Sequence, residues 1–465
     1  MAYNKKKEDC FMPVNSFENY YMSWVPEKTT DHTPMYKSFA NQLEEAILSF
    51  QLPPNTLLPP QRELADYLDV NLSTITKAYK ICEQKGYLYA ITGKGTYVSP
   101  NALLYKKTDT NSKPMHNLRT VEPFHISDGL MEAATKRIVE RPDFHKLLTY
   151  QCSELSDYHK LIAAKYLQQL NVPALPAQLM ISNGSQNALT IAMLSLFQTG
   201  DRIAVDVFTY HHFKMLANFL GILLYPIEND SFGMLPERLE HSCKRNRLQG
   251  IYLMPSCSNP TAIEMPLNRR RELSEMIAKY NLLVLEDDSY RFLSDTLCPT
   301  FYELLPQQTI YINSTTKALS SGLRIAYLLY PERLQNHLLN GERATNLHYN
   351  SFDAEIISEL INSGHYISIH TAKREASHER NELFNSIFDL SPNAENPYSF
   401  YRWLYVGPDN RSFIRNLNAQ SISVMESQLF NAGTEHADYY VRIALSSEPE
   451  LSVLENALEV IKVSL

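Results

Sequence analysis

Two short apolar runs that end abruptly in polar residues constrain the fold of this 465-residue chain most strongly. The run 250–254 is followed by Asn259, and the run 282–285 leads into Asp287 and Tyr290. Apolar runs of this length, bounded by turn residues, are typical of buried β-strands. In parallel α/β sheets, ligand sites form at the carboxyl ends of such strands. We therefore expect an α/β fold with a functional site at this edge of its sheet.

A lysine that stands between hydroxyl residues and an arginine marks a third segment of the chain. Lys317 follows Ser314 and Thr316, and Arg324 lies seven residues after it. A lysine amine can form a Schiff base with an aldehyde, while the two hydroxyls and the guanidinium can converge on one phosphate. These groups are the ones that anchor pyridoxal phosphate, so we expect Lys317 to be the catalytic Schiff-base residue.

The two strand ends supply the other groups that this cofactor requires. A carboxylate must face the pyridine nitrogen to keep the ring protonated, and donors must face the phenolic oxygen. Asp287 is the candidate for the first role. Tyr290 and Asn259 are the candidates for the second.

The three segments, in this order, resemble the fold type I aminotransferases, whose pattern runs Asn-Pro-Thr-Gly, then Asp-x-x-Tyr, then Ser-x-Ser-Lys followed by Arg. The resemblance covers about residues 120 to 465 and implies a large mixed-sheet α/β domain with a small C-terminal subdomain. It implies that Gly184, Ser185 and Gln186 open a helix whose N-terminus holds the phosphate. It also implies that Tyr210 stacks on the pyridine ring and that Arg442 grips the α-carboxylate of an effector.

The chain departs from the pattern of that family at several positions. Ala262 and Ala326 each replace a glycine and add a methyl group. Leu155 stands where the family has a glycine five residues after Tyr150, in a loop that reaches the cofactor of the partner subunit. The segment 398–404 lacks the two glycines of the family, which predicts a narrower substrate pocket.

The first quarter of the chain has the pattern of short helices followed by a hairpin. Apolar residues recur at helical spacing from Met35 onward, and a second helix is expected to open at the prolines 59–60. Ser73 is the expected cap of a third helix, which ends near Gly86. The segment 87–98 alternates in hydropathy and turns on two glycines, which predicts a β-hairpin.

Residues 35–100 resemble the winged-helix domain of the GntR-type regulators, and its fusion to an aminotransferase-like domain resembles the MocR subfamily. The resemblance implies that double-stranded DNA meets the third helix and the wing. The residues expected to bind DNA are Arg62, Asn71, Ser73, Thr74, Lys77, Gly95 and Thr96. The family's arginine at the start of the third helix is absent, so Asn71 is expected to read adenine. Leu72 either touches a thymine methyl or packs in the core at the turn.

Charge and composition limit the other functions that the chain can have. Its net charge is −8, and residues 35–100 carry six basic and six acidic side chains, so DNA binding is predicted from the motif and not from bulk charge. Six scattered cysteines favour neither a disulfide framework nor a metal site. With no signal peptide or apolar run long enough for a membrane span, we expect a cytoplasmic bacterial protein.

The sequence thus predicts a DNA-binding regulator that holds pyridoxal phosphate and responds to a small amine, an amino acid or the cofactor level. We expect a head-to-tail homodimer with four segments per chain: an extension of unknown role at 1–34, the winged helix at 35–100, a linker at 101–120 and the cofactor domain at 121–465. The alternative is an active aminotransferase with an appended DNA-binding domain. A third possibility is a regulator that has lost its cofactor.

Overall fold

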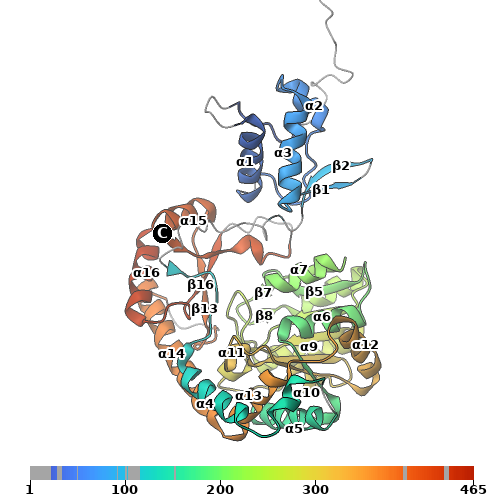
Figure 1. Cartoon of the computed structure of the whole chain (residues 1–465), viewed down its shortest axis with the longest axis vertical. Coiled ribbons are helices and arrows are strands. Elements are labelled where there is room, and N and C mark those ends of the chain that lie inside the picture. Colours follow the sequence, from blue (N-terminus) through green and yellow to red (C-terminus); the bar gives the residue numbers. More distant parts are fainter. Residues whose placement is uncertain are drawn as a thin grey trace, which may run out of the picture. The chain divides into compact units, whose positions relative to one another are not determined.

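The computed structural model divides the chain into two compact units, residues 1–113 and 114–465, which are described separately (Figure 1). The structure describes residues 22–28, 34–49, 51–91, 93–99, 102, 116–150, 153–390, 395–433 and 439–465. The expectations for residues 1–21 and for most of the linker, 103–115, lie outside the described residues.

The first unit is a three-helix domain with a β-hairpin, as the sequence predicts. Its elements are α1 (Met35–Leu48), α2 (Gln61–Tyr67), α3 (Leu72–Gln84), β1 (Leu88–Ile91) and β2 (Gly95–Val98). The apolar faces predicted from helical spacing form one core, in which Leu64, Ile75 and Ala78 are fully buried. The strands pair antiparallel, and the turn between them uses Gly93 and Gly95 at φ +78° and +118°, backbone conformations that favour glycine.

The predicted cap of the third helix is wrong by two residues. The helix α3 begins at Leu72, and the Oδ1 atom of Asn71 accepts a hydrogen bond of 2.8 Å from the backbone N–H of Ser73. Asparagine and serine are both good capping residues, so local preference alone did not decide between them. Ser73 is instead an exposed residue of the first turn.

Part of the N-terminal extension packs against the first unit. Trp24 is packed against the core of this domain, and the hydroxyl of Ser23 donates to the carbonyl of Leu57 at 2.6 Å. The backbone N–H of Glu27 donates to Gln42 on α1. Residues 23–27 therefore extend the winged helix beyond the range in which the sequence predicts it.

The second unit is built on a seven-stranded mixed sheet. Its strand order is β4 (Leu179–Ser182), β12 (Ala326–Leu329), β11 (Thr309–Ser314), β10 (Leu283–Asp287), β9 (Gly250–Leu253), β5 (Arg202–Asp206) and β6 (Leu223–Ile227). The pairings from β11 to β6 are parallel, whereas β12 runs antiparallel to both of its neighbours. Both predicted apolar strands are present as β9 and β10, next to each other.

Helices cover both faces of this sheet, so its strands are buried. They are α4 (Asp128–Val139), α5 (Ser153–Gln169), α6 (Ser185–Leu196), α7 (His211–Phe219), α8 (Pro236–Arg245), α9 (Leu267–Tyr280), α10 (Phe301–Leu304), α11 (Thr315–Ala318), α12 (Gln335–Thr345) and α13 (Ser351–Asn362). A small hairpin joins β7 (Asn229–Asp230) to β8 (Gly233–Met234).

The long helix α14 (His365–Phe388) leads to a smaller C-terminal subdomain (Figure 1). That subdomain contains β13 (Tyr401–Tyr405), α15 (Asn410–Ala419), β14 (Ile422–Ser423), β15 (Met425–Glu426), β16 (Tyr440–Ala444) and α16 (Leu451–Val463). The large α/β domain and this smaller subdomain agree with the predicted fold class.

Residues 116–120, which the sequence assigns to the linker, pack within the second unit. The strand β3 (His116–Asn117) pairs parallel to β14, and Leu118 is fully buried in the core of the C-terminal subdomain. Arg119 forms an ion pair of 2.9 Å with Glu426. The polar composition of this stretch hid these contacts, because they are made to residues about 300 positions later in the chain.

Two negative findings apply to the described residues. None of their helices has the length and apolar character needed to cross a membrane. They also contain no group of three or more His, Cys, Asp or Glu side chains arranged to hold a metal ion.

Candidate functional site

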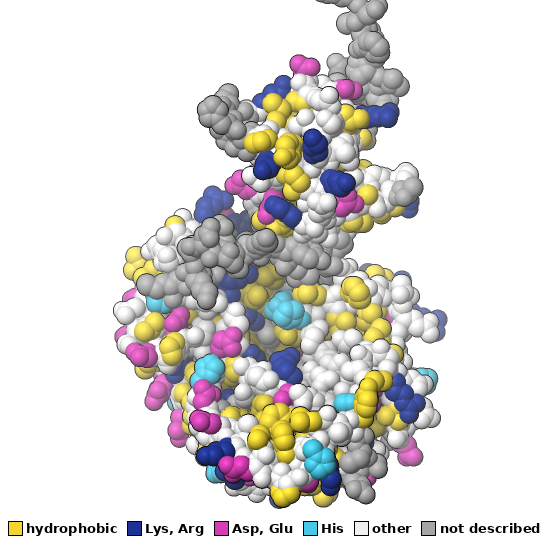
Figure 2. Space-filling model, viewed as in Figure 1, with side chains coloured by type: hydrophobic (Ala, Val, Ile, Leu, Met, Phe, Trp, Pro, Cys, Tyr) yellow, Lys and Arg dark blue, Asp and Glu magenta, His cyan; other side chains and the backbone are white. Residues whose placement is uncertain are grey.

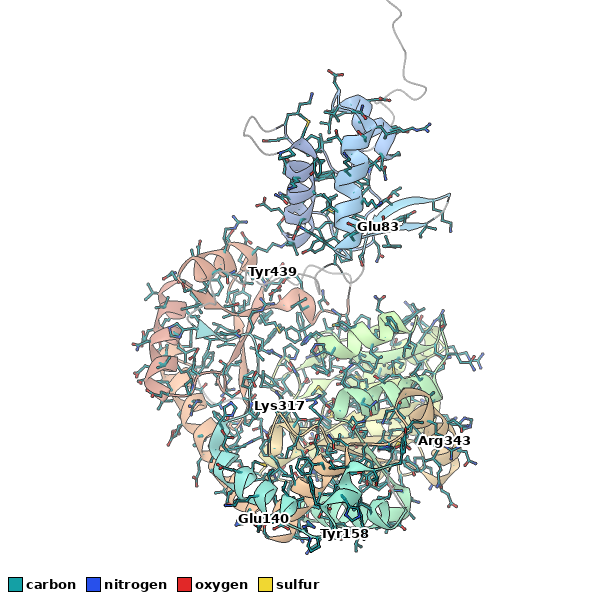
Figure 3. All side chains as sticks on the ribbon, viewed as in Figure 1. Glu83, Glu140, Tyr158, Lys317, Arg343 and Tyr439 are labelled. Carbon is teal, nitrogen blue, oxygen red and sulfur yellow. The ribbon has the colours of Figure 1, made fainter. Side chains whose placement is uncertain are left out.

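A cavity of about 560 Å³ lies in the second unit where the strands β10 and β11 end. Figure 3 shows Lys317 there, between the large sheet and the C-terminal elements. All of the residues predicted from sequence to bind cofactor or effector line this cavity, except Gly184, which abuts it at Arg324. They are Ser185, Gln186, Tyr210, Asn259, Asp287, Tyr290, Ser314, Thr316, Lys317, Arg324 and Arg442.

One end of the cavity has the donors for a phosphate group. Gly184 precedes α6 at φ +87°, and a Cβ atom at this position would lie 3.0 Å from the Nη2 atom of Arg324. The guanidinium therefore packs directly over the helix start, where free N–H groups and the helix dipole favour an anion. The hydroxyls of Ser314 and Thr316 lie 3.0 Å apart beside it. The backbone N–H of Arg324 donates to Asp353 at 3.3 Å. No carboxylate of the described residues forms an ion pair with its guanidinium, so that charge is left for a ligand.

The opposite wall carries a buried carboxylate and phenols. Asp287 accepts hydrogen bonds from the hydroxyls of Tyr252 at 3.1 Å and Ser289 at 2.6 Å. Burial raises the pKa of Asp287, and these bonds partly oppose that effect. Such a carboxylate gains from a cationic partner, which a protonated pyridine nitrogen provides. Burial, followed by the charge of Asp287, raises the pKa of Tyr210 to about 12.

Lys317 projects into the cavity from the short helix α11. Its Nζ atom donates to the backbone carbonyl of Val121. The pKa of Lys317 is lowered to about 8, chiefly by burial; Glu122 opposes this shift, and the nearby cations Arg442 and Arg324 contribute to it. A lysine in this environment has a substantial fraction of neutral, nucleophilic amine at physiological pH.

Arg442 is a buried cation that lines the cavity. Its Nη1 atom donates to Oδ1 of Asn259 at 2.9 Å, and its Nη2 atom donates to the backbone carbonyl of Arg119 at 2.7 Å. The guanidinium also lies over the rings of Tyr401 and Phe430. No ion pair with a carboxylate is formed by Arg442 within the described part of the chain, so a ligand carboxylate would be its first anionic partner.

Eight lining residues escaped the sequence prediction, and three of them carry ionisable side chains: Arg119, His211 and His212. The two histidines begin α7, directly after Tyr210, and their ring centroids lie 3.9 Å apart. Burial lowers the pKa of both rings, and the charge of Arg442 lowers both further. The charge of His212 also lowers the pKa of His211. They are therefore neutral hydrogen-bonding groups near pH 7. Their position next to Tyr210 is the only sequence signal that marks them.

Comparison with known proteins decides the family. The sequence matches the family Aminotransferase class I and II over residues 120–461 and the family Bacterial regulatory proteins, gntR family, over residues 35–98. It is 35% identical over 455 residues to the uncharacterized HTH-type transcriptional regulator YdeF of Bacillus subtilis (strain 168), and 97% of this chain and 98% of that protein are covered. The chain belongs to the MocR-type transcriptional regulators. Pyridoxal phosphate is accordingly the cofactor of this regulator.

Two further matches bear on the cofactor domain of the regulator. The chain is 26% identical over 291 residues to the vitamin B6 salvage pathway transcriptional repressor PtsJ of Salmonella typhimurium, covering 62% of this chain and 65% of that protein. The crystal structure of LysN, an alpha-aminoadipate aminotransferase from Thermus thermophilus, matches with a TM-score of 0.69 and 21% identity, covering 76% of this chain and 92% of that chain. This structural likeness supports the fold type I architecture.

The DNA-binding candidates of the regulator lie on α2, α3 and the hairpin. Figure 2 shows Lys and Arg side chains gathered over the face of the first unit that carries α3. Arg62, Asn71, Ser73, Lys77 and Gly95 are exposed, whereas Thr74 and Thr96 are half-buried. Leu72 is 39% exposed, so it does not pack in the core at the turn. Its side chain is left available for contact with DNA.

The structure also locates the departures from the aminotransferase pattern. Ala262 has φ +60°, a conformation that favours the glycine of the family, and its backbone N–H donates to Ser258. Leu155 lies within the helix α5 and Tyr150 is 79% exposed. None of these three side chains lines the cavity of this chain.

Proposed function

We propose that this regulator binds DNA with an affinity that depends on what occupies its cofactor cavity. The observation that carries the proposal is a pair of hydrogen bonds to one segment. Lys317 holds the carbonyl of Val121, and Arg442 holds the carbonyl of Arg119. The segment 116–121 directly follows the connection to the first unit. The two side chains proposed to meet ligands therefore hold the start of the cofactor domain.

The residues around the cavity fit pyridoxal phosphate. Ser185, Ser314, Thr316 and Arg324 would hold its phosphate, with Gln186 and the N-terminus of α6 beside them. Asp287 would face the ring nitrogen, Tyr210 would stack on the ring, and Asn259 and Tyr290 would meet its phenolic oxygen. When bound, the cofactor supplies an aldehyde that reacts with amines and an electron-withdrawing ring.

The rest of the cavity lining indicates the class of effector. After the cofactor groups are set aside, the remaining lining consists of Arg442, the two neutral histidines, Met254, Ser289, Met425 and the segment 119–121. The side chain of Arg119 is already paired with Glu426. This part of the cavity therefore offers one unpaired cation and no free carboxylate among the described residues. An amino acid, with its α-carboxylate on Arg442, fits this pattern better than an amine without a carboxylate.

Ligand binding would change the hydrogen bonds that Lys317 and Arg442 donate to segment 116–121. A carboxylate on the guanidinium of Arg442 competes with the carbonyl of Arg119 for the same N–H groups. A covalently engaged Lys317 has fewer N–H groups to donate to Val121. Such a change moves DNA binding only if the ligand has different affinities for the DNA-competent and DNA-incompetent states. The match to PtsJ, a vitamin B6 salvage pathway repressor, supports cofactor level as a second signal at the same site.

The rate of cofactor capture is expected to rise with pH up to about pH 8. The neutral amine is the nucleophile, and burial lowers the pKa of Lys317 to about 8. Below that pH the rate should increase about tenfold per pH unit, and above it the rate should level off. Stopped-flow mixing of cofactor-free protein with pyridoxal phosphate measures this profile. A rate that continues to rise to about pH 10, as for an ordinary exposed lysine, would contradict the assigned environment.

The proposed regulator is a head-to-tail homodimer. Exposed apolar side chains support an interface on the large domain: Leu148 is 67% exposed, Tyr150 79% and Leu347 72%. Tyr150 packs edge-on against His348, so Tyr150 and Leu347 are close neighbours on this surface. Sedimentation equilibrium measures the oligomeric state, and a monomer at micromolar concentration would exclude this part of the proposal.

An active aminotransferase is the rival function, because the cavity retains both the lysine and the carboxylate that transamination requires. Steady-state turnover with an amino acid and a 2-oxo acid acceptor, measured beside DNA affinity, separates the two. The proposed regulator changes its DNA affinity on ligand binding and shows at most a slow half-reaction. Sustained turnover without any change in DNA affinity favours the enzyme.

Arg62→Ala is expected to weaken DNA binding regardless of sequence and to reduce the salt dependence by about one phosphate contact.

Asn71→Ala is the contrasting variant. Because Asn71 caps α3, its loss should destabilise the first unit by about 1 kcal/mol. Asn71→Ser keeps a capping oxygen, so a change in base preference in this variant would come from DNA contact alone. Salt titrations of DNA affinity and thermal melts measure both effects, and an unchanged salt slope for Arg62→Ala would remove this residue from the interface.

A further inference from the structure

A lysine buried inside the second unit touches the backbone that carries Lys317. Lys373 on α14 is fully buried. Its Nζ atom donates to the carbonyl of Leu319 at 2.6 Å and to the carbonyl of Lys317 at 3.2 Å. Lysine is almost never fully buried unless it is paired. A side chain this costly to bury indicates a function at its position.

Lys373 is not paired with a carboxylate in the described part of the chain. Asp128 is the acidic group that acts on it, but that carboxylate is 70% exposed and forms its own contact with His125. The other titratable groups around it are Lys317, His370 and Arg374, and none of them is acidic. The backbone carbonyls of the Lys317 turn are thus the groups that solvate this amine.

These carbonyls belong to the turn from which Lys317 projects. The helix α11 has a single turn, and Ser314 caps its start by accepting from the N–H of Thr316. At its other end, the carbonyls of residues 317 and 319 accept hydrogen bonds from Nζ of Lys373. The turn is therefore fixed at its start by Ser314 and at its end by Lys373.

We propose that Lys373 is a positioning residue for Lys317: it holds the turn 315–319 so that Nζ of Lys317 points into the cavity. Burial, and then the charge of Lys317, lower the pKa of Lys373 to about 7. This inference rests on the proposed role of Lys317 as the cofactor-bearing residue.

The test compares two variants of α14. Each variant loses a side chain that donates to two backbone carbonyls. Lys373→Met removes the donor at the Lys317 turn and keeps the length of the side chain. Ser377→Ala is the matched control, because the hydroxyl of Ser377 donates to the carbonyls of Tyr398 and Ser399, away from Lys317. The readouts are the rate at which full-length protein loses pyridoxal phosphate to a scavenger and the pH midpoint of the absorbance band of the bound cofactor.

Lys373→Met should release the cofactor about tenfold faster than wild type. The release rate of Ser377→Ala should stay within about twofold of the wild-type rate. The pH midpoint should change in Lys373→Met, because loss of the hydrogen bonds to the carbonyls of residues 317 and 319 lets the Lys317 turn shift, and stay constant in Ser377→Ala. Wild-type values in Lys373→Met, or equal changes in both variants, would overturn the proposal. If Lys373→Met does not fold, the same two measurements are made on Lys373→Gln, whose side chain is shorter but still carries a donor. Absence of a covalent cofactor in wild type would instead refute the proposed function itself.

Discussion

Replacement of Lys317 by alanine is expected to abolish covalent attachment of pyridoxal phosphate. Lys317 is the lysine that lines the cavity, and burial brings the pKa of its amine to about 8, where it can act as a nucleophile. Wild-type protein treated with borohydride should carry a phosphopyridoxyl group on the peptide that contains Lys317. The variant should show no such adduct by mass spectrometry and no corresponding absorbance band.

Lys214→Met is the matched control for this experiment. Burial also lowers the pKa of Lys214 to about 8, but its amine donates to the backbone carbonyls of Gln428, Leu429 and Asn431. A lowered pKa is therefore shared by both lysines, and only Lys317 faces the cavity. Lys214→Met should keep the adduct on Lys317. A reducible adduct that persists in Lys317→Ala would show that another lysine carries the cofactor.

Arg442→Ala is expected to raise the effector concentration needed for a response by roughly 10- to 150-fold. A charged bidentate contact contributes about 1.5–3 kcal/mol, and Arg442 forms no ion pair with a carboxylate of the described residues. The probe is the amino acid, among the twenty common ones, that most changes the absorbance of the bound cofactor. Titration of that change in wild type and variant measures the effect.

The outcome of this substitution distinguishes the possible effectors. Arg442→Lys keeps the charge but not the two-pronged geometry, so its response should lie between those of wild type and Arg442→Ala. An unchanged response in both variants would mean that the effector has no carboxylate or is the cofactor itself. Loss of bound pyridoxal phosphate in Arg442→Ala would mean that Arg442 serves mainly to hold Asn259 in place.

The sequence predicted the parts of the molecule in which local chemistry determines structure. Helical spacing predicted the buried face of α3, because Ile75, Ala78 and Cys82 recur at the period of a helix. Apolar runs predicted β9 and β10, and the order of the motifs predicted the residues that meet at the end of these strands. Local preference failed at the start of α3, where Asn71 and Ser73 are both suitable caps.

Contacts between distant parts of the chain were beyond prediction from one sequence. Arg119 lies in a polar stretch that reads as a linker, yet its carbonyl is held by Arg442, more than 300 residues later. Lys373 has no motif around it, and its role comes from the packing of α14 against the Lys317 turn. In both cases the sequence identifies the residue type but not its partner.

Control of DNA binding by the cofactor cavity can be measured as the DNA affinity of the full-length protein in three states: free of cofactor, loaded with pyridoxal phosphate, and loaded in the presence of the most effective amino acid. The DNA is a sequence selected from a random library by the wild-type protein. We expect at least one step to change the dissociation constant by roughly 5- to 150-fold at fixed salt, and Lys317→Ala to show no such change. Equal affinity of wild type in all three states, together with sustained transamination, would contradict this expectation.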